Sequence, residues 1–313
     1  LWCYLPAPLG LVIDIVFVLP LLAVFFKRFY TKTGHYTRRN PLLIGLVIWS
    51  IYCLLELFNP EAPSKEAWFY AMRGLALYPL LAVGLSMELL HRTEDLFGFV
   101  RHWLLYSMFA ALYGIQQLYI GLTAAEKAWL AAGNASTHIL HGHLRVFSFY
   151  SDAGQFGAAM AHVGLVVLVV AFGQKGAMAK LTYGLAAVLC FYGMVISGTR
   201  GAFFVPLAGL VAYLLLLRNI RLVLVGSIVA LGIVGMLKFT YIGQSNYQIQ
   251  RMRSALDPND SSLLVRLENQ KRLQVYLSPR PFGGGIGTAG YLGRRFSPHT
   301  VFAQAPTLRW ESE

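Results

Sequence analysis

Residues 181–217 have the sequence LTYGLAAVLCFYGMVISGTRGAFFVPLAGLVAYLLLL. Two apolar runs, Leu181–Ser197 and Ala202–Leu217, are separated by a very short turn that carries one charged residue, Arg200. An α-helix rises about 1.5 Å per residue, so runs of this length approach the thickness of the hydrocarbon core of a bilayer, about 30 Å. The pattern predicts a hairpin of two membrane-spanning helices.

The same kind of run recurs along the whole chain. Of its 313 residues, 57% are hydrophobic and 13% are charged, which is far too apolar for a soluble domain of this size. The runs lack the alternation of apolar and polar residues that a membrane β-barrel requires. We therefore predict an all-α, polytopic transmembrane helical bundle. Its eight expected spans are Pro8–Phe26, Pro41–Phe58, Trp68–Leu90, Leu96–Ile120, Gln155–Phe172, Leu181–Ser197, Ala202–Leu217 and Leu222–Tyr241.

Basic residues mark one side of the membrane. Short cytoplasmic loops carry an excess of Lys and Arg. The first, third, fifth and seventh loops hold most of the basic residues found between spans, which are Lys27, Arg28, Lys32, Arg38, Arg39, Arg92, Lys175, Lys180, Arg218 and Arg221. This distribution predicts that these loops are cytoplasmic and that the turn at Arg200 faces outward.

The last seventy or so residues form the largest segment outside the predicted spans. We expect a transmembrane helical domain over residues 1–241 and an external, periplasmic segment over residues 242–313. The external segment is strongly basic, but long translocated segments escape the positive-inside bias, so the predicted topology stands. Its charge fits either anionic lipid head groups or an anionic substrate held at the outer surface.

Arg200 has two interpretations. An arginine at a helix end can extend its side chain to the lipid head groups. Alternatively, the guanidinium meets an anion, since a turn this short gives little other reason for a charge between Gly198 and Gly201. Because arginine presents a rigid fork that suits phosphate oxygens, we favour a functional role for Arg200.

A second polar cluster lies on the same predicted side. The stretch RVFSFYSDAGQFGAAMAH begins at Arg145 and carries Asp152 and Gln155 at the mouth of the fifth span. Asp152 is also a candidate N-cap, a structural role that alone would account for it. Three histidines within residues 138–143 lack a carboxylate or cysteine at a convincing spacing, so we expect no metal site.

The external segment contains the pattern GxGxxG within GGGIGTAG, residues 283–290. A dinucleotide-binding site needs a strand before this pattern and a helix after it, and we expect neither, so we reject that function. Upstream, residues 257–277 predict an amphipathic helix that begins at Asp260 or Ser261. Downstream, His299 follows in a proline-containing exposed loop.

Three groups of motifs follow one another along the chain. RVFSFYSDAGQFGAAMAH comes first, SGTRGAF lies between two spans, and the outer segment holds VRLENQKR, RPFGGGIGTAGY and PHT. This ordered set, from Arg145 to Thr300, resembles the O-antigen ligase and Wzy-type polysaccharide polymerase superfamily, and SDAGQFGA resembles its polymerase-like members in exopolysaccharide and capsule clusters. The family continues past the outer histidine into further spans. The resemblance therefore implies a fragment that lacks the C-terminal spans.

The resemblance also implies an activity, which is glycosyl transfer by a multi-pass protein at the periplasmic face of the bacterial inner membrane. The implied donor is a glycan on a polyprenyl diphosphate, and the acceptor is a sugar hydroxyl of another glycan. Polymerisation of repeat units is favoured, and ligation of a glycan to a lipid core is the alternative. Membrane lipids and other polysaccharide export components are expected partners, whereas nucleic acid, a cofactor and a metal are not expected.

Particular residues fit this chemistry. Departure of a lipid diphosphate requires fixed positive charge near its oxygens, which Arg200 and Arg145 can supply. The attacking hydroxyl needs a general base, and His299 matches the outer-loop histidine of the family. Arg266 matches the loop arginine of the family more loosely. The expected substrate-binding residues are Arg266, Asp152 and Gln155.

A rival hypothesis from another class is a secondary transporter or lipid-linked flippase. Its solute path would be lined by Arg73, Glu88, Arg101 and Arg200. Such proteins often contain internal repeats, and none is found in this sequence. A structural or regulatory membrane subunit is a third hypothesis, but it would leave the order of the outer motifs unexplained.

The hypotheses differ in where polar residues should meet. Transport predicts that they meet at the bilayer midplane. Transfer predicts that they meet at the outer rim, with Arg145, Arg200 and His299 around an outward-facing cavity and Asp152 near its wall.

Overall fold

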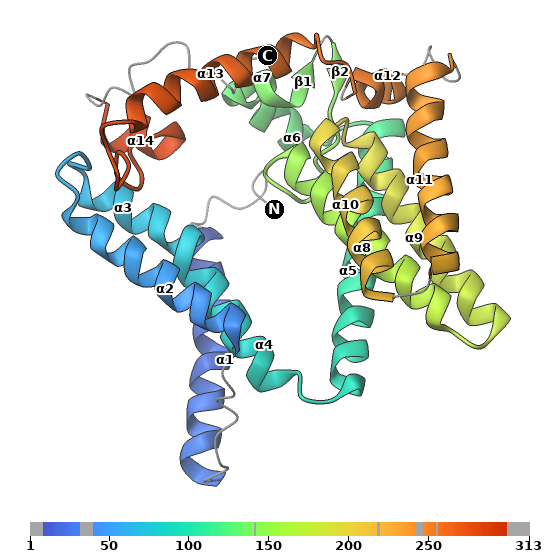
Figure 1. The fold of residues 1–313 in the computed structure, drawn as a ribbon, viewed down its shortest axis with the longest axis horizontal. Coiled ribbons are helices and arrows are strands. Elements are labelled where there is room, and N and C mark those ends of the chain that lie inside the picture. The colour runs from blue at the N-terminus through green and yellow to red at the C-terminus, as the bar shows by residue number, and fades with distance from the viewer. Residues whose placement is uncertain are drawn as a thin grey trace. The chain divides into compact units, whose positions relative to one another are not determined.

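The computed structural model describes residues 9–31, 40–140, 142–217, 220–241, 247–254 and 256–298. Most of these residues are helical (Figure 1). A short antiparallel strand pair, β1 (Ile139–Leu140) with β2 (His143–Leu144), accompanies the helices. The predicted helical class is therefore confirmed.

The long helices follow the predicted apolar runs. They are α1 (Leu9–Thr31), α2 (Pro41–Leu55) with η1 (Glu56–Phe58), α3 (Lys65–Met72) with η2 (Arg73–Leu77) and α4 (Tyr78–Leu89), α5 (Thr93–Tyr119), α8 (Ala153–Gly173), α9 (Ala177–Ile196), α10 (Arg200–Leu217) and α11 (Ile220–Phe239). The shorter helices are α6 (Ala124–Trp129), η3 (Leu130–Asn134), α7 (Ala135–His138), α12 (Tyr247–Ser254), α13 (Ser261–Leu277) and α14 (Gly290–Phe296).

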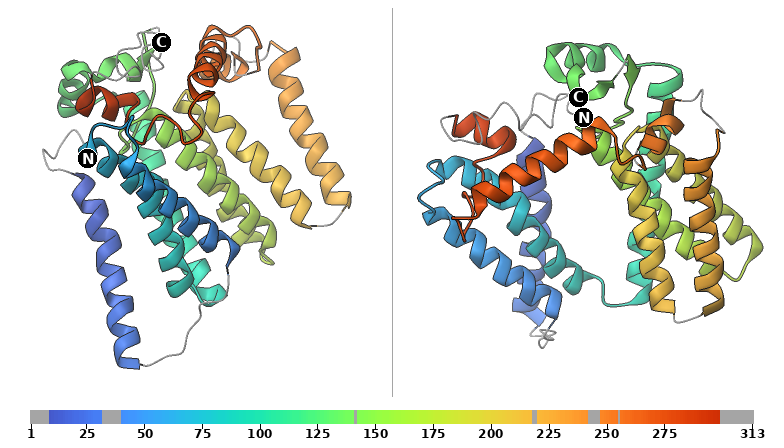
Figure 2. Two further views of the ribbon diagram at one scale, coloured as in Figure 1. Left: turned by 60° about the vertical axis from the view of Figure 1, so that its left-hand side comes forward. Right: turned by 45° about the horizontal axis from the view of Figure 1, so that its top comes forward.

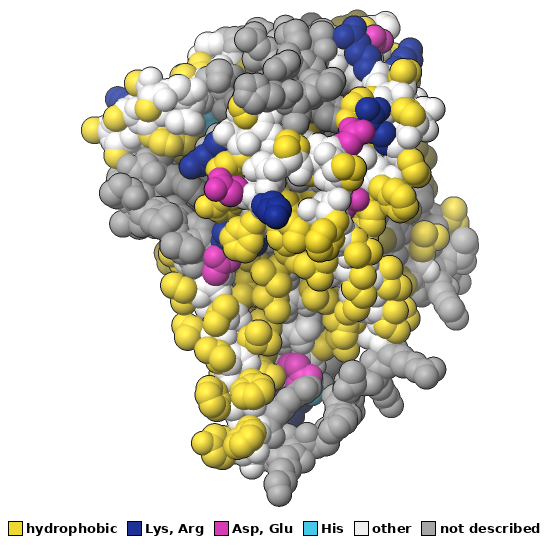
Figure 3. Space-filling view, turned by 90° about the vertical axis from the view of Figure 1, so that its left-hand side faces the viewer, with side chains coloured by type: hydrophobic (Ala, Val, Ile, Leu, Met, Phe, Trp, Pro, Cys, Tyr) yellow, Lys and Arg dark blue, Asp and Glu magenta, His cyan; other side chains and the backbone are white. Residues whose placement is uncertain are grey.

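Within the described residues, four helical stretches are long and apolar enough to cross a membrane. They are Pro41–Phe58, Lys65–Leu89, Ala153–Gly173 and Ala177–Ile196. Figure 3 shows one face of the molecule, where hydrophobic side chains cover a broad area and most of the visible charged side chains gather at one end. Such a surface suits hydrocarbon better than water. The chain therefore carries membrane-embedded helices, and the count of eight spans stays a prediction.

The chain packs into two units. Unit 1 contains the described residues within 97–264, and unit 2 combines those within 7–96 and 265–310. The predicted boundary near residue 241 concerns the membrane, and it stays a prediction. Packing divides the chain elsewhere, because residues after 264 pack with the first helices.

Close helix contact forms the core of unit 1, where α8 packs against α9 and α10 (Figure 1). A Cβ atom added to Gly157 of α8 would lie 2.2 Å from Ser197 Oγ. One added to Gly164 would lie 3.0 Å from the ring of Phe191 in α9. Small residues thus let these helices approach, as they do in other membrane bundles.

The segment between α5 and α8 is fixed by a buried carboxylate, Glu126. It accepts hydrogen bonds from Tyr113 Oη at 2.8 Å, from Gln117 Nε2 at 2.7 Å and from the backbone nitrogen of Thr123 at 2.7 Å. Burial by itself would raise the pKa of Glu126, but these hydrogen bonds outweigh it and lower the pKa. The hydrogen bonds of Glu126 therefore hold the segment between α5 and α8, which carries Arg145, in place.

In unit 2, an ion pair joins α1 to the continuous helix formed by α3, η2 and α4. Arg73 Nη2 donates to one oxygen of Asp14, and Tyr78 Oη donates to the other at 2.7 Å. The guanidinium carbon of Arg73 also lies 5.7 Å from the ring centre of Phe69. The helix α2 packs against η2 and α4 (Figure 2).

The glycine-rich turn before α14 packs against the loop before α3 and against the first turn of α3. A Cβ added to Gly285 would lie 2.4 Å from Ala62 Cβ, and one added to Gly287 would lie 2.6 Å from the Ala67 backbone. Glu61 in the same loop accepts from Arg280 Nε at 2.7 Å and from Tyr276 Oη at 2.7 Å. The helix α13 rather than a strand precedes this turn, whereas the helix α14 after it was not expected from the sequence. Close packing accounts for these glycines.

Candidate functional site

The turn between α9 and α10 has a defined local structure. Ser197 is buried, and its Oγ donates to the carbonyl of Met194 at 2.6 Å and accepts from Thr199 N at 3.2 Å. Gly198 has φ of 60°, a conformation that glycine adopts without steric cost. The turn therefore sets Thr199 and Arg200 side by side at the start of α10.

Arg145 reaches this turn from the loop that follows β2. Its Nη2 donates to Thr199 Oγ1 at 3.0 Å, and its Nη1 donates to the carbonyl of Thr137 at 2.9 Å. Its Nε is buried and has no hydrogen-bond partner among the residues described. Burial lowers the pKa of Arg145, and the nearby charge of Arg200 adds to this effect. The two predicted arginines thus lie within electrostatic reach of each other.

Arg200 is the first residue of α10, where the helix dipole disfavours a cation unless an anion is close. Asp260 supplies that anion, since Arg200 Nη1 donates to its Oδ2 at 2.5 Å. Both side chains are mostly buried, with 17% and 16% exposed. The other carboxylate oxygen accepts from Leu263 N at 3.0 Å, so Asp260 also caps α13. The predicted start of this helix is confirmed.

A third arginine, Arg251 on α12, belongs to the same group. Ser254 links it to Arg200, because Ser254 Oγ accepts from Arg200 Nη1 at 3.2 Å and donates to the Arg251 carbonyl at 2.9 Å. Burial lowers the pKa of Arg251, and the charges of Arg200 and Arg145 push in the same direction. We call Arg145, Arg200 and Arg251 the guanidinium cluster.

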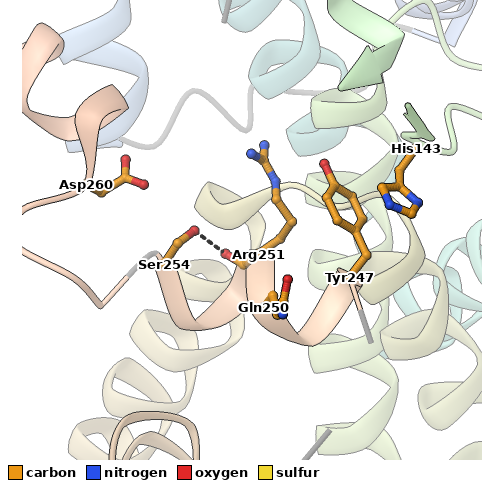
Figure 4. A pocket seen from close by; sticks show the side chains of 6 residues that line it. All are labelled: His143, Tyr247, Gln250, Arg251, Ser254 and Asp260. Atoms are coloured by element: carbon orange, nitrogen blue, oxygen red, sulfur yellow. Dashed lines mark hydrogen bonds between the residues drawn. The ribbon is translucent and has the colours of Figure 1, made fainter. Parts of the chain in front are cut away.

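Arg251 of the guanidinium cluster lines an open pocket of about 440 Å³ in unit 1, together with Asp260, the partner of Arg200. Figure 4 shows Arg251 and Tyr247 projecting side by side from α12, with the ring of His143 next to Tyr247. The ring centres of His143 and Tyr247 are 4.2 Å apart, with 20° between the ring planes. The lining residues are His143, Tyr247, Gln250, Arg251, Ser254 and Asp260. Positive charge beside an aromatic wall suits an anion that carries a larger group.

Two of the predicted substrate-binding residues lie at the start of α8. Asp152 is its N-cap, and its Oδ1 accepts from Gly154 N at 2.6 Å and from Gln155 N at 3.3 Å. The charge of Asp152 also acts on Arg145, so it lies near the guanidinium cluster. The side chain of Gln155 is exposed and accepts from Ser151 Oγ at 3.0 Å. The structural role of Asp152 is thus directly visible.

The structure does not place the other two predicted residues relative to this group. Arg266 is exposed on α13, in the part of that helix that belongs to unit 2. His299 lies outside the described residues. The structure therefore brings Arg145 and Arg200 together, and the convergence of His299 with them stays a prediction.

Sequence reasoning missed Arg251 and the partner of Arg200. Arg251 and Arg253 both occur in YQIQRMRS and look alike in the sequence. Residues two apart on a helix point to different sides, so the spacing indicates that they differ, but not which one meets Arg200. The link between Asp260 and Arg200 joins residues sixty positions apart, and no local pattern announces it.

The comparisons with known proteins concern the same part of the chain. Residues 185–312 match the family model described as O-antigen ligase. This segment, which we call the O-antigen ligase segment, is similar to that family. The O-antigen ligase segment includes Arg200, Arg251 and Asp260, whereas Arg145 precedes it. No curated protein and no solved structure was found to match the chain.

The family resemblance predicted from the motifs is confirmed at this level. An O-antigen ligase segment indicates an enzyme of polysaccharide ligation or polymerisation, with activity of the glycosyltransferase kind, in a bacterial membrane. It also indicates a lipid-linked glycan and an acceptor as the general classes of substrate.

Proposed function

We propose that the protein polymerises oligosaccharide repeat units carried on a polyprenyl diphosphate, at the periplasmic face of the inner membrane. The observation that carries this proposal is the guanidinium cluster beside an open pocket, at and next to the O-antigen ligase segment. A leaving diphosphate develops negative charge on its oxygens, and preorganised guanidinium groups stabilise such charge strongly. The cluster therefore offers what the leaving group of this reaction needs.

In the proposed step, the hydroxyl oxygen of the acceptor sugar attacks the anomeric carbon of the donor glycan. A carbon–oxygen bond forms while the bond between that carbon and the phosphate oxygen breaks. The electron pair of the broken bond leaves with the lipid diphosphate, which faces Arg145 and Arg200. The hydroxyl proton passes to a general base, for which we propose His299.

We propose supporting roles for three further residues. Asp152 holds the start of α8 and contributes a negative charge near Arg145, which keeps that guanidinium ionised. Gln155 is exposed at the same helix end and offers an amide to a sugar hydroxyl. Arg266 offers an exposed positive charge to the donor or to the acceptor glycan.

The ligase alternative uses the same bond changes with a different acceptor. A polymerase joins repeat units and yields a ladder of products, whereas a ligase transfers one glycan to a lipid core and yields a single conjugate. The full-length protein, reconstituted with lipid-linked oligosaccharide and either acceptor, separates the two by electrophoresis of the products.

The transport alternative requires four charged residues along one path. Arg73 is paired with Asp14, and Arg101 is exposed. The transfer hypothesis explains the guanidinium cluster more directly.

Arg200 provides the test of the proposal. In the reconstituted assay, we expect Arg200→Ala to reduce product formation by about 10²–10³, the usual cost of losing one preorganised donor. Arg200→Lys keeps the charge but loses the fork, so we expect a smaller but clear reduction. Arg272→Gln is the matched control, because Arg272 is 55% exposed and pairs with Glu268 within α13. Unchanged product formation in Arg200→Ala, at equal protein level, would refute the assigned role.

A further inference from the structure

The three arginines of the guanidinium cluster are not equivalent. Arg145 is bonded to Thr137 and Thr199, and Nη1 of Arg200 is bonded to Asp260 and Ser254. The guanidinium of Arg251 makes no hydrogen bond or ion pair with the residues that the structure describes, and its Nε is buried. The donors of the Arg251 guanidinium are therefore not used by the described residues.

An arginine in this state does not stabilise the fold. The side chain is half-buried with its Nε fully buried, and a charged group that loses part of its water without gaining a partner costs free energy. The neighbouring charges of Arg200 and Arg145 increase that cost, since they oppose protonation of Arg251. A polar group that is buried without a partner calls for an explanation, and a ligand that arrives from outside is one.

The pocket gives that ligand a place. Arg251 lines it together with Ser254 and Asp260 (Figure 4). Ser254 accepts from the guanidinium of Arg200 and donates to the backbone carbonyl of Arg251, so it holds the two residues close together. The charge of Arg200 accordingly acts on the guanidinium of Arg251. Nε and Nη2 of Arg200 have no partner within the described chain, which leaves them available next to the fork of Arg251. Two neighbouring sets of donors suit an anion with two phosphate groups.

We propose that Arg251 binds one of the two phosphate groups of the donor and so selects lipid diphosphates over lipid monophosphates. This inference rests on the proposed function, because it assigns the same leaving group to the same pocket. Arg200 and Arg145 hold the first phosphate group, and Arg251 holds the second. A monophosphate leaves Arg251 unpaired, so it gains less from binding.

The experiment compares two probes on the purified full-length protein in detergent, farnesyl diphosphate and farnesyl monophosphate, by calorimetric titration. We expect Arg251→Gln to weaken binding of the diphosphate about ten- to hundredfold, as for loss of a charge-assisted hydrogen-bond pair. Binding of the monophosphate should change by less than about threefold. Arg251→Lys should fall between wild type and Arg251→Gln for the diphosphate, because it keeps the charge and loses the fork. Arg272→Gln should leave both affinities unchanged.

Thermal melting distinguishes a binding role from a structural one. If Arg251 binds ligand and adds nothing to the fold, the melting temperature of Arg251→Gln should equal or exceed that of the wild type. A lower melting temperature together with equal loss of both probes would assign Arg251 to the fold and overturn the inference. Equal loss of both probes at unchanged melting temperature would reduce Arg251 to a general positive charge, and unchanged affinity for both would remove it from the site.

Two further arms separate this inference from the function on which it rests. Inorganic pyrophosphate should bind more weakly than farnesyl diphosphate, and equal affinity for the two would contradict a lipid-linked ligand. If Arg251→Gln loses selectivity for the diphosphate while Arg200→Ala retains full transfer, the proposed function fails and the phosphate-binding role of Arg251 stands. If Arg200→Ala loses transfer while Arg251→Gln keeps its selectivity for the diphosphate, the proposed function stands and the phosphate-binding role of Arg251 fails.

Discussion

Arg73 in unit 2 is buried and Arg251 in unit 1 is half-buried with its Nε fully buried, and the surroundings of the two arginines differ in one decisive way. Arg73 donates to Asp14 and Tyr78 and lies over aromatic rings, so its charge is balanced inside the protein. Arg251 sits beside two other arginines and donates to no described residue. The surroundings of Arg73 stabilise the fold, whereas those of Arg251 leave its positive charge available to an anionic ligand.

This difference shows how a charge in a membrane protein can be assigned. Charged residues within spans are functional candidates by default. A carboxylate at hydrogen-bond distance moves Arg73 to a structural role, and the lack of one among the described neighbours of Arg251 moves it to a binding role. The number of hydrogen-bond and ion-pair partners inside the protein therefore separates a structural arginine from a binding arginine better than burial alone does.

The largest predicted effect concerns the chemical step of the transfer reaction. If arginines bind the donor and His299 takes the proton, His299→Ala should reduce transfer by about 10²–10⁴ while affinity for farnesyl diphosphate stays within about twofold. Because guanidinium groups supply the positive charge, transfer by the wild type should persist in EDTA. Activity that disappears with EDTA and returns with magnesium or manganese would sink the metal-free mechanism. Full transfer in His299→Ala would remove that histidine from it.

A substitution at Arg73 tests the structural role that the comparison assigns to that residue. Arg73→Leu removes the positive charge that balances Asp14 and leaves it with the hydrogen bond from Tyr78 Oη, so we expect a loss of about 3 kcal/mol in the free energy of unfolding. Chemical denaturation in detergent micelles measures this loss. Affinity for farnesyl diphosphate should not change in the fraction that stays folded. A clear loss of affinity in that fraction would show that Arg73 also takes part in donor binding.

The smallest expected effect concerns Asp260. Asp260→Asn removes the negative charge next to Arg200, whereas an asparagine keeps the N-cap of α13. With one less anion beside the guanidinium cluster, farnesyl diphosphate should bind a few-fold more tightly, as the same calorimetric titration can measure. Weaker binding in Asp260→Asn would instead mean that the carboxylate is needed to orient Arg200.

Much of the fold follows from apolar runs, because a lipid environment favours one solution for a long apolar segment, a helix with all its backbone groups bonded internally. The predicted span Pro41–Phe58 coincides with the helical stretch that the structure contains. The helix predicted from Trp68 begins three residues earlier, at Lys65, where Ser64 caps it. Capping of this kind is a local signal that the search for apolar runs does not use.

The candidate site was only half predictable, for a physical reason. Arg145 and Arg200 stand out because each is an isolated charge near an apolar run. Arg251 lies among many basic residues after the last predicted span, and its burial depends on how α12 packs near the turn at Thr199. Tertiary contacts of this kind have no local sequence pattern, so the third arginine became visible only in the structure.

Photochemical labelling tests most directly whether the guanidinium cluster binds the lipid diphosphate. The probe is a farnesyl diphosphate analogue with a diazirine next to the diphosphate, applied to the full-length protein in detergent, with and without excess unlabelled farnesyl diphosphate. Mass spectrometry of the digested protein then locates the labelled peptides. We predict competed labelling in α12 and at the start of α10, around Arg251 and Arg200, and loss of that labelling in Arg200→Ala. Competed labelling confined to the residues around Arg73, or labelling of α12 and α10 that persists unchanged in Arg200→Ala, would contradict the assignment.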